Sequence, residues 1–410
     1  MNQENSLWSR RHFLTAIAGS GALLALNPLH SWGFDEVDPR VAEIVSATFG
    51  IDTHNHIDVP LLSSELPGPD INISAEMRKS GLSAICATFA LDYQKLNKEG
   101  ESYERLLNGL SSLDSALKKN GMKRALNSED LQKAFKKRQP IVIQSIEGSH
   151  FLEGHIERIK IAYDRGLRHI TLLHDSDASV PLGDVYTNQP KFGGLTDFGT
   201  SVIKECNRLG ILVDLAHASA ETVDGALKVA AHPVLISHTG LDTQLGDNPQ
   251  MARMMKPRLI SKERAKIVAN AGGVIGVWTH LSDTPLAYAQ NIRALVDVVG
   301  VDHVCIGTDT KLTPAYRSPG EPGFGQQGPA KPKADNNKQP DGEKPQGNSG
   351  NQNKKRNGQG TNESWGADKT GFYYAVVDGL LKTGFNKDEI AKIGGGNFLR
   401  IFGAATKGHS

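Results

Sequence analysis

Eight short apolar runs constrain the fold of this chain more than any other feature of the sequence. Most of them are separated by helical patterns, and each has the length and the Ile, Val and Leu content of a buried strand. The runs cover residues 51–57, 82–91, 140–147, 169–174, 211–217, 233–238, 273–280 and 303–309. Strands that alternate with helices predict a parallel sheet, so we expect an α/β fold of the (β/α)8 TIM-barrel type.

Helical patterns fill most of the gaps between the runs. They cover residues 38–49, 103–119, 128–137 and 195–209, and Ser128 is the expected N-cap of the third. A doubly wound open sheet is the alternative fold, but its nucleotide site would require a G-x-G-x-x-G turn after an early strand. No such turn follows an early run, which favours the barrel.

Polar residues end several of the apolar runs. His54 and His56 lie two residues apart in I-D-T-H-N-H-I-D-V, so both side chains should leave the same face of a strand. The ends of later runs supply Glu147, His174, His217, His238 and Asp309. Because catalytic groups of a (β/α)8 barrel sit at the carboxyl ends of its strands, we expect these side chains to meet in one site.

Imidazole and carboxylate groups are the expected ligands of zinc, and two ions bridged by one carboxylate can share a hydroxide. The expected ligands of the first ion are His54, His56 and Glu147, and those of the second are Glu147, His217 and His238. Asp309 would orient the bridging water and carry its proton to a leaving amine. His174 would bind a substrate carbonyl or the oxyanion, or satisfy a backbone group. The remaining candidates, His150, His155, His169, His280 and His303, have no comparable pattern.

The charge balance and the cysteines limit the partners. A net charge of +1, from 46 basic and 45 acidic residues, argues against nucleic acid or an acidic membrane and favours a small-molecule substrate. Cys86, Cys206 and Cys305 lie far apart, which indicates buried thiols rather than disulfides. We expect one barrel domain over residues 35–312 and 369–406, with a homodimer as an open alternative to a monomer.

Two segments fall outside the barrel pattern. Ser9-Arg10-Arg11-His12-Phe13-Leu14 and the apolar run to Leu26 resemble a twin-arginine export signal over residues 1–34. This predicts a periplasmic protein that the twin-arginine machinery exports; a basic-hydrophobic helix or anchor is the alternative. Residues 313–369 contain no Val, Ile, Leu or Met, so we expect a disordered insertion over 313–368. It is either a solvated insertion without a role, or a lid or partner contact, and packed structure should resume near Trp365.

Nine segments occur in the order that the membrane (renal-type) dipeptidase family, peptidase family M19, shows. They are I-D-T-H-N-H-I-D, S-I-E-G-S-H, G-L-R-H-I-T-L-L-H, G-G-L-T-D-F-G, V-D-L-A-H-A-S, P-V-L-I-S-H-T, N-A-G-G-V-I-G-V, C-I-G-T-D and G-G-N-F-L-R-I-F. The resemblance implies a zinc-dependent, amidohydrolase-like barrel peptidase that cleaves dipeptides, including those with a C-terminal D-residue. It matches metal ligands to His54, Glu147, His217 and His238, the catalytic aspartate to Asp309, the substrate-binding histidine to His174 and the carboxylate-binding arginine to Arg258.

The sequence departs from the family pattern close to these positions. His56 replaces an aspartate, which removes one negative charge from the first metal and gives the H-x-H motif of the wider amidohydrolase superfamily. Arg253 rivals Arg258 as the carboxylate-binding residue. The segment D-S-D-A-S-V-P-L-G-D after His174 lacks the family tryptophan, and Thr310-Lys311 is atypical.

The sequence therefore predicts an exported two-zinc hydrolase in which a metal-bound hydroxide attacks the amide bond of a dipeptide. Another amidohydrolase reaction, the hydrolysis of an N-acyl amino acid or a lactone, is the alternative within the same chemistry. An inactive exported metal-binding protein is the alternative outside it.

Overall fold

A computed structural model describes residues 37–92, 95–313, 360–365 and 370–409. The predicted export signal lies outside these residues, as does most of the predicted insertion. Among the described residues, no helix combines the length and the apolar character that crossing a bilayer requires.

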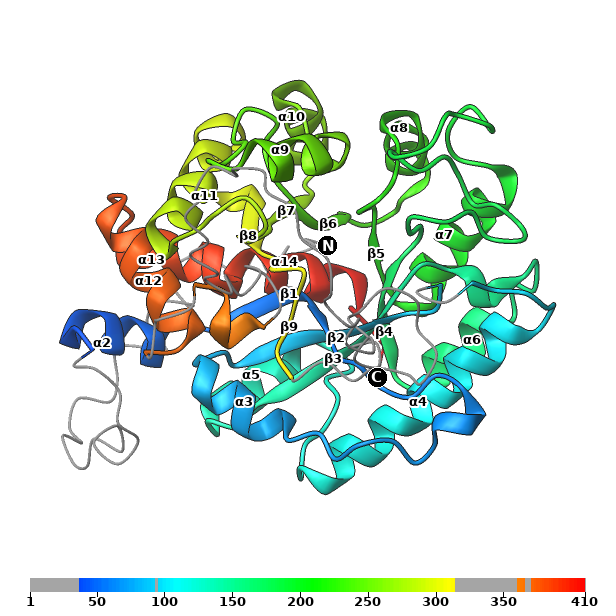
Figure 1. Cartoon of the computed structure of the whole chain (residues 1–410), viewed down its shortest axis with the longest axis horizontal. Helices are drawn as coiled ribbons and strands as arrows, with labels where there is room; N and C mark the ends of the chain where they lie inside the picture. Colours follow the sequence, from blue (N-terminus) through cyan, green and yellow to red (C-terminus); the bar gives the residue numbers. More distant parts are fainter. Residues whose placement is uncertain (1–36, 93–94, 314–359, 366–369, 410) are drawn as a thin grey trace, which may run out of the picture. The chain divides into compact units, whose positions relative to one another are not determined.

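All eight predicted strands are present, and they form one curled parallel sheet (Figure 1). The strands are β1 (Ile51–His56), β2 (Ala84–Ala90), β3 (Ile141–Glu147), β4 (Leu167–Thr171), β5 (Leu212–Asp214), β6 (Leu235–Thr239), β7 (Val274–Val277), β8 (Val304–Ile306) and a further short strand β9 (Thr310–Lys311). Their order in the sheet is β8-β7-β6-β5-β4-β3-β2-β1-β9. From β1 to β8, strands that are neighbours in the chain are thus neighbours in the sheet, as in a βα array.

Residues 304–311 contain β8 and β9, the two strands at opposite edges of the sheet. Strand β8 pairs with β7, whereas β9, which follows it directly, pairs with β1. Between the two strands the backbone N–H of Asp309 donates to the carbonyl of His54 at 3.1 Å. Asp52 in β1 holds the same segment, because its Oδ1 and Oδ2 accept from the backbone N–H and the hydroxyl of Thr308 at 2.8 and 2.6 Å. The last strand end is therefore fixed against the first.

Helices surround the sheet (Figure 1). They are α2 (Pro39–Ala47), α3 (Ile73–Ser80), α4 (Glu101–Lys119), α5 (Ser128–Lys136), α6 (Arg158–Asp164), α7 (Asp197–Leu209), α8 (Ala220–Val229), α9 (Pro249–Met255), α10 (Lys262–Asn270), α11 (Pro285–Val299), α12 (Phe372–Lys382), α13 (Lys387–Ala391) and α14 (Asn397–Ala405), with short 3-10 turns at Ser63–Glu65, His150–Leu152, Lys256–Arg258, Val301–His303 and Thr361–Glu363 and a π-helical turn, η7, at Lys392–Gly396. The prediction that Ser128 caps its helix was wrong: Asn127 is the N-cap, and its side chain accepts from the backbone N–H of Asp130 at 3.0 Å. Both residue types cap well, so local sequence alone does not choose between neighbours.

The C-terminal helix α14 covers the end of the sheet where the strands begin. One buried cluster joins its Phe398, Ile401 and Phe402 to the first residues of most strands, among them Ile51, Ala84, Ile141, Leu212, Leu235 and Val274. The approach is close, since a methyl group added at Gly395 would lie 2.3 Å from the carbonyl oxygen of Phe49. This apolar cluster fills the end of the sheet where the strands begin, and the polar site residues lie at the opposite end, where the strands finish.

The sequence predicted disorder over residues 313–368, but residues 360–365 are packed against the domain that contains the curled sheet. The hydroxyl of Thr361 accepts from Asn55 Nδ2 at 2.8 Å and lies 2.7 Å from that of Thr310, and the indole N–H of Trp365 donates to the carbonyl of Ser282 at 3.2 Å. Hydrogen bonds hold Thr361, whereas Trp365 also packs against the apolar core, where its ring stacks on Phe372 with the ring centroids 5.3 Å apart. Residues 360–365 therefore belong to the packed structure.

The three cysteines are buried free thiols, as predicted. Burial raises the pKa of Cys305 to about 12, which makes it inert at neutral pH.

Candidate metal centre

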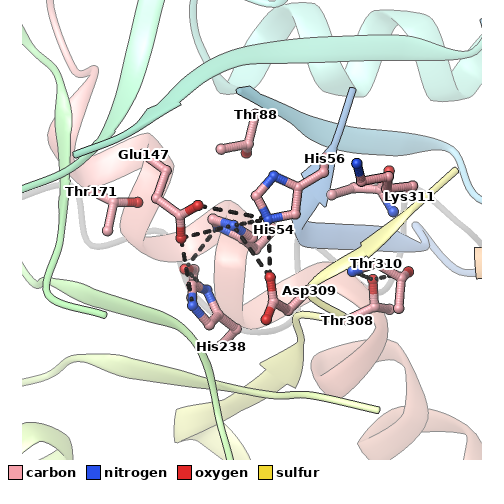
Figure 2. Close-up of polar contacts among 12 residues, drawn as sticks. His54, His56, Thr88, Glu147, Thr171, His238, Thr308, Asp309, Thr310 and Lys311 are labelled. Atoms are coloured by element: carbon pink, nitrogen blue, oxygen red, sulfur yellow. Dashed lines mark hydrogen bonds and ion pairs between the residues drawn. The ribbon is translucent and has the colours of Figure 1, made fainter. Parts of the chain in front are cut away.

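Glu147, the last residue of β3, lies at the centre of the predicted ligands and is 1% exposed (Figure 2). Its Oε1 lies 3.0 Å from His217 Nε2, 3.3 Å from His54 Nε2 and 3.7 Å from His238 Nε2. Its Oε2 lies 3.6 Å from His56 Nε2. The structure therefore brings all five predicted ligands together around one carboxylate.

His54 and His56 leave the same face of β1, as their spacing predicts, and their Nε2 atoms lie 3.3 Å apart. A single hydroxyl orients two of the rings: Ser237 Oγ lies 3.2 Å from Nδ1 of His54 and 2.9 Å from Nδ1 of His238. This contact at Nδ1 leaves Nε2 of both rings directed at Glu147. Ser237 was not anticipated from the sequence, where a serine before a histidine carries no signal.

The sequence predicted that His217 and Asp309 end their strands, but both residues lie after the strand end. Strand β5 ends at Asp214 and β8 at Ile306. Both residues adopt left-handed backbone, with φ of +66° and +55°, a conformation that side chains other than glycine rarely take. Such a conformation costs about 1–3 kcal/mol and is concentrated at functional sites. The turn it makes carries each side chain into the site from a short strand.

Asp309 is held on both sides. Its Oδ1 lies 3.0 Å from His56 Nε2 and its Oδ2 lies 2.7 Å from His280 Nε2. Burial opposes ionisation, but the imidazole of His238 and the hydrogen bonds from His280 and His56 hold the pKa of Asp309 well below its usual range. The sequence pattern assigned no role to His280, which was wrong, since it ends its apolar run just as the other site residues do.

His174 also lies beside Glu147. Its Nε2 is 3.4 Å from Glu147 Oε2, and its Nδ1 is 2.5 Å from Asp92 Oδ1. Asp92 Oδ2 accepts in turn from the hydroxyl of Ser176 at 2.5 Å. Asp92 was missed, although it directly follows the apolar run over residues 82–91 and so carries the signal used for the other strand ends.

Asp175 connects the ligand His217 to the predicted carboxylate-binding arginine. Its Oδ1 lies 3.0 Å from His217 Nδ1, and its Oδ2 accepts from Arg258 Nη2 at 2.7 Å. The hydroxyl of Tyr186 also lies 3.1 Å from His217 Nδ1. Arg258 lines the site, whereas Arg253 is exposed and does not, so the structure favours Arg258 of the two.

A cavity of about 410 Å³ opens onto these groups. Its volume is in the range of sites that hold small molecules. It is lined by His56, Asp92, Glu147, His174, Asp175, Ser176, His217, Arg258 and Asp309.

The pKa values of the clustered groups are strongly coupled to the charge of Glu147. Burial lowers the pKa of His54 and of His217, but Glu147 and, for His217, Asp175 raise both values overall to about 9. Burial and the neighbouring His54 lower the pKa of His238 to about 3. Burial also opposes the ionisation of Glu147, yet the surrounding imidazoles hold its pKa well below its usual range. An ionised carboxylate therefore lies among crowded ring nitrogens.

The donor set fits divalent metal. The buried Glu147 Oε2 has no hydrogen-bond partner, and the Nε2 atoms of His217 and His238 face one another at 3.0 Å. Three groups of donor atoms, each within 4.8 Å of one another, consist of His54, Glu147 and His238; of His54, His56 and Asp309; and of Glu147, His174 and His217. These overlapping groups are consistent with a binuclear site bridged by Glu147. They add Asp309 and His174 to the donors that the sequence predicted.

Comparison with solved structures supports the fold. An amidohydrolase from Pseudomonas aeruginosa matches with a TM-score of 0.65 at 20% identity, over 89% of this chain and 98% of that one. The probable dipeptidase PvdM from Pseudomonas aeruginosa matches with 0.66 at 15% identity, over 90% and 100%. A metallo peptidase from Rhodobacter sphaeroides, liganded with a phosphinate mimic of the dipeptide L-Ala-D-Ala, matches with 0.61 at 14% identity, over 87% and 99%.

The sequence comparison identifies the family. The profile of the membrane dipeptidases matches residues 39–316, which include every predicted ligand and both ends of the sheet. The curled parallel sheet and the buried His/Glu/Asp clusters agree with this match. The chain belongs to the membrane dipeptidase family, peptidase family M19.

Proposed function

We propose that this chain hydrolyses the amide bond of dipeptides with two zinc ions that Glu147 bridges. The convergence of four histidine Nε2 atoms on one buried carboxylate carries the proposal. Nitrogen and carboxylate oxygen are the donors that zinc takes in catalytic sites. Two bound ions would lower the pKa of a shared water and polarise the scissile carbonyl.

Asp309 would move the proton. With Oδ2 held by His280, its Oδ1 faces His56 and the cavity, where it can accept a proton from the attacking water and return it to the leaving amine. The lowered pKa of Asp309 keeps its carboxylate ionised at neutral pH.

His174 would bind the developing oxyanion. Burial lowers its pKa, but the carboxylates of Glu147 and Asp92 raise it overall. In its protonated form His174 has two N–H donors. Nδ1–H would donate to Asp92, and Nε2, which lies 3.4 Å from Glu147 Oε2, would donate to the developing oxyanion beside that carboxylate. Arg258, on the cavity wall, would receive the free carboxylate of the substrate.

Metal analysis and substrate assays on the same purified protein test the proposal. We expect about two zinc ions per chain, turnover of L,L- or L,D-dipeptides, loss of turnover with a chelator and recovery on adding zinc. Glu147→Gln should lose metal and activity together, whereas Asp177→Asn, a change at an aspartate that pairs with Lys191 and does not line the cavity, should lose neither. A zinc-loaded protein that leaves every dipeptide intact but hydrolyses N-acyl amino acids or lactones would replace the dipeptide assignment.

The twin-arginine motif at residues 9–14 supports a second proposal, that the chain is exported to the periplasm. Replacing Arg10 and Arg11 together with lysine should keep the protein in the cytoplasm. Cell fractionation measures this, and equal periplasmic amounts of both proteins would contradict it.

A further inference from the structure

The guanidinium of Arg258 is already paired with the carboxylate of Asp175 in the protein without substrate. Among the described residues it is the one arginine or lysine that lines the cavity, and its Nη2 donates to Asp175 Oδ2 at 2.7 Å. Both side chains are partly exposed, 28% for Arg258 and 39% for Asp175, and both face the same cavity. A substrate carboxylate that approaches the guanidinium therefore approaches Asp175 as well.

The second oxygen of Asp175 has a contact of its own, so the side chain is not free to move away when a substrate carboxylate approaches Arg258. Its Oδ1 lies 3.0 Å from Nδ1 of the ligand His217. Moving the carboxylate off Arg258 would loosen its contact with a ring that faces Glu147. Such contacts from outside the ligand set fix ring orientation at metal centres, which favours an Asp175 that stays in place.

The other cavity carboxylates are directed elsewhere. Asp92 bonds His174 and Ser176, and Asp309 bonds His56 and His280. Asp175 alone among the lining carboxylates is paired with the guanidinium. Its charge opposes that of a second carboxylate at the same arginine, which weakens the attraction by Coulomb repulsion.

We propose that Asp175 is a specificity-determining residue that lowers the preference of Arg258 for a free carboxylate, so that the enzyme cleaves dipeptide amides as well as dipeptides. This inference rests on the proposed function. An uncharged carboxamide can still accept a hydrogen bond from the guanidinium without meeting the repulsion. The substrate class is thus short peptides with either a carboxylate or a carboxamide at the C-terminal end.

Asp175→Asn tests the proposal, because asparagine keeps an oxygen that can accept from His217 and removes the charge. The zinc-loaded full chain is assayed on alanyl-alanine and on alanyl-alanine amide, and the ratio of their kcat/KM values is compared. We expect the wild type to cleave both, and the variant to raise the ratio in favour of the dipeptide about tenfold, mainly through a lower KM for the dipeptide.

Two controls isolate the charge. Asp177→Asn, two positions along the chain, should leave the ratio unchanged. In an Arg258→Gln background, Asp175→Asn should no longer raise the ratio, because the two effects act through one pair. Equal metal content in all variants excludes an effect through His217.

An unchanged or lower ratio in Asp175→Asn would overturn the inference and would indicate instead that Asp175 holds Arg258 in a productive position. If the wild type cleaves neither substrate, the proposed function fails, and the role of Asp175 is tested by comparing the affinities of two substrate mimics. Calorimetry with a phosphinate mimic of alanyl-alanine and with its carboxamide should then give the same tenfold change, and an unchanged affinity ratio would again overturn the inference.

Discussion

His280 Nε2 lies 2.7 Å from Asp309 Oδ2, on the opposite oxygen from the one that faces His56. This contact fixes the rotation of the carboxylate, since a free aspartate would turn about its terminal bond. The main chain of Asp309 is tied to β1 through the hydrogen bond from its N–H to the carbonyl of His54, but that bond does not set the rotation of the carboxylate. His280 is thus a positioning residue for the proposed proton carrier.

His280→Ala should lower kcat about tenfold to a hundredfold, because Asp309 is then free to leave the geometry for proton transfer. KM for the dipeptide and the metal content should change little. Steady-state kinetics and metal analysis measure the three quantities, and His280→Gln, which retains a donor, should recover part of kcat. A loss of metal that parallels the loss of kcat would instead make His280 a support of the metal site.

Asp309→Asn should lower kcat by about 10²- to 10⁴-fold, since an amide of the same shape cannot accept the proton. Four histidines and Glu147 remain as ligands when Asp309 is replaced, so we expect the variant to keep its metal. Single-turnover assays and metal analysis check this. Loss of one ion would show that Asp309 acts as a ligand together with His54 and His56, the group in which its oxygen also lies.

Asp92→Ala should lower kcat/KM for dipeptides about tenfold to a hundredfold, because His174 loses the acceptor at Nδ1 that orients its ring toward Glu147. Ser176→Ala removes the second contact of Asp92 and the contact of Ser176 Oγ with His150 Nε2 at 3.1 Å, but it leaves Asp92 on His174 and should have a much smaller effect. Comparison of the two variants by steady-state kinetics separates orientation of His174 from general damage to the loop. Equal losses in both would contradict the positioning role.

Asp184 should make part of the stability depend on pH. Burial opposes its ionisation, but its oxygens accept from the backbone N–H groups of Lys191 at 2.6 Å, Gly194 at 2.8 Å and Phe192 at 3.0 Å, and the pKa is lowered overall. A carboxyl whose pKa is lower in the folded than in the unfolded state stabilises the fold at neutral pH. That contribution is lost as the pH falls below about 4, the unfolded value, and through the folded one.

Asp184→Asn should therefore reduce the free energy of unfolding at pH 7 by about 1–3 kcal/mol, and the difference from wild type should shrink toward pH 3. Urea unfolding at both pH values, with chelator present so that metal loss does not contribute, measures the difference. A gap that stays constant or widens at low pH would contradict this assignment.

Local patterns in the sequence accounted for much of the fold. All eight strands lie within or beside their predicted runs, because a buried parallel strand needs only a short apolar segment between turns. The errors occurred where local preference is weak. Asn127 rather than Ser128 caps α5, and residues 360–365 pack through hydrogen bonds of Thr361 and ring contacts of Trp365 that composition does not reveal.

The sequence also identified the chemical groups of the centre, since imidazoles and carboxylates at strand ends share one end of a parallel sheet. The family resemblance, rather than the pattern, supplied the predicted role of Arg258, and it chose substrate binding among the roles that the pattern had left open for His174. The backbone of His217 and Asp309 was not anticipated, because a left-handed turn at a residue other than glycine has no signature in a single sequence.

The sequence by itself determined the strands, the helices and the residue types that meet at their ends. Only the tertiary structure decided how those residues pair: Asp92 with His174, Asp175 with Arg258 and His280 with Asp309, across 82, 83 and 29 positions of the chain. The physical reason is range. Strand and helix patterns follow from neighbouring residues. A hydrogen bond between distant side chains depends instead on the position of each strand end to within about an ångström, and the packing of the whole fold sets that position.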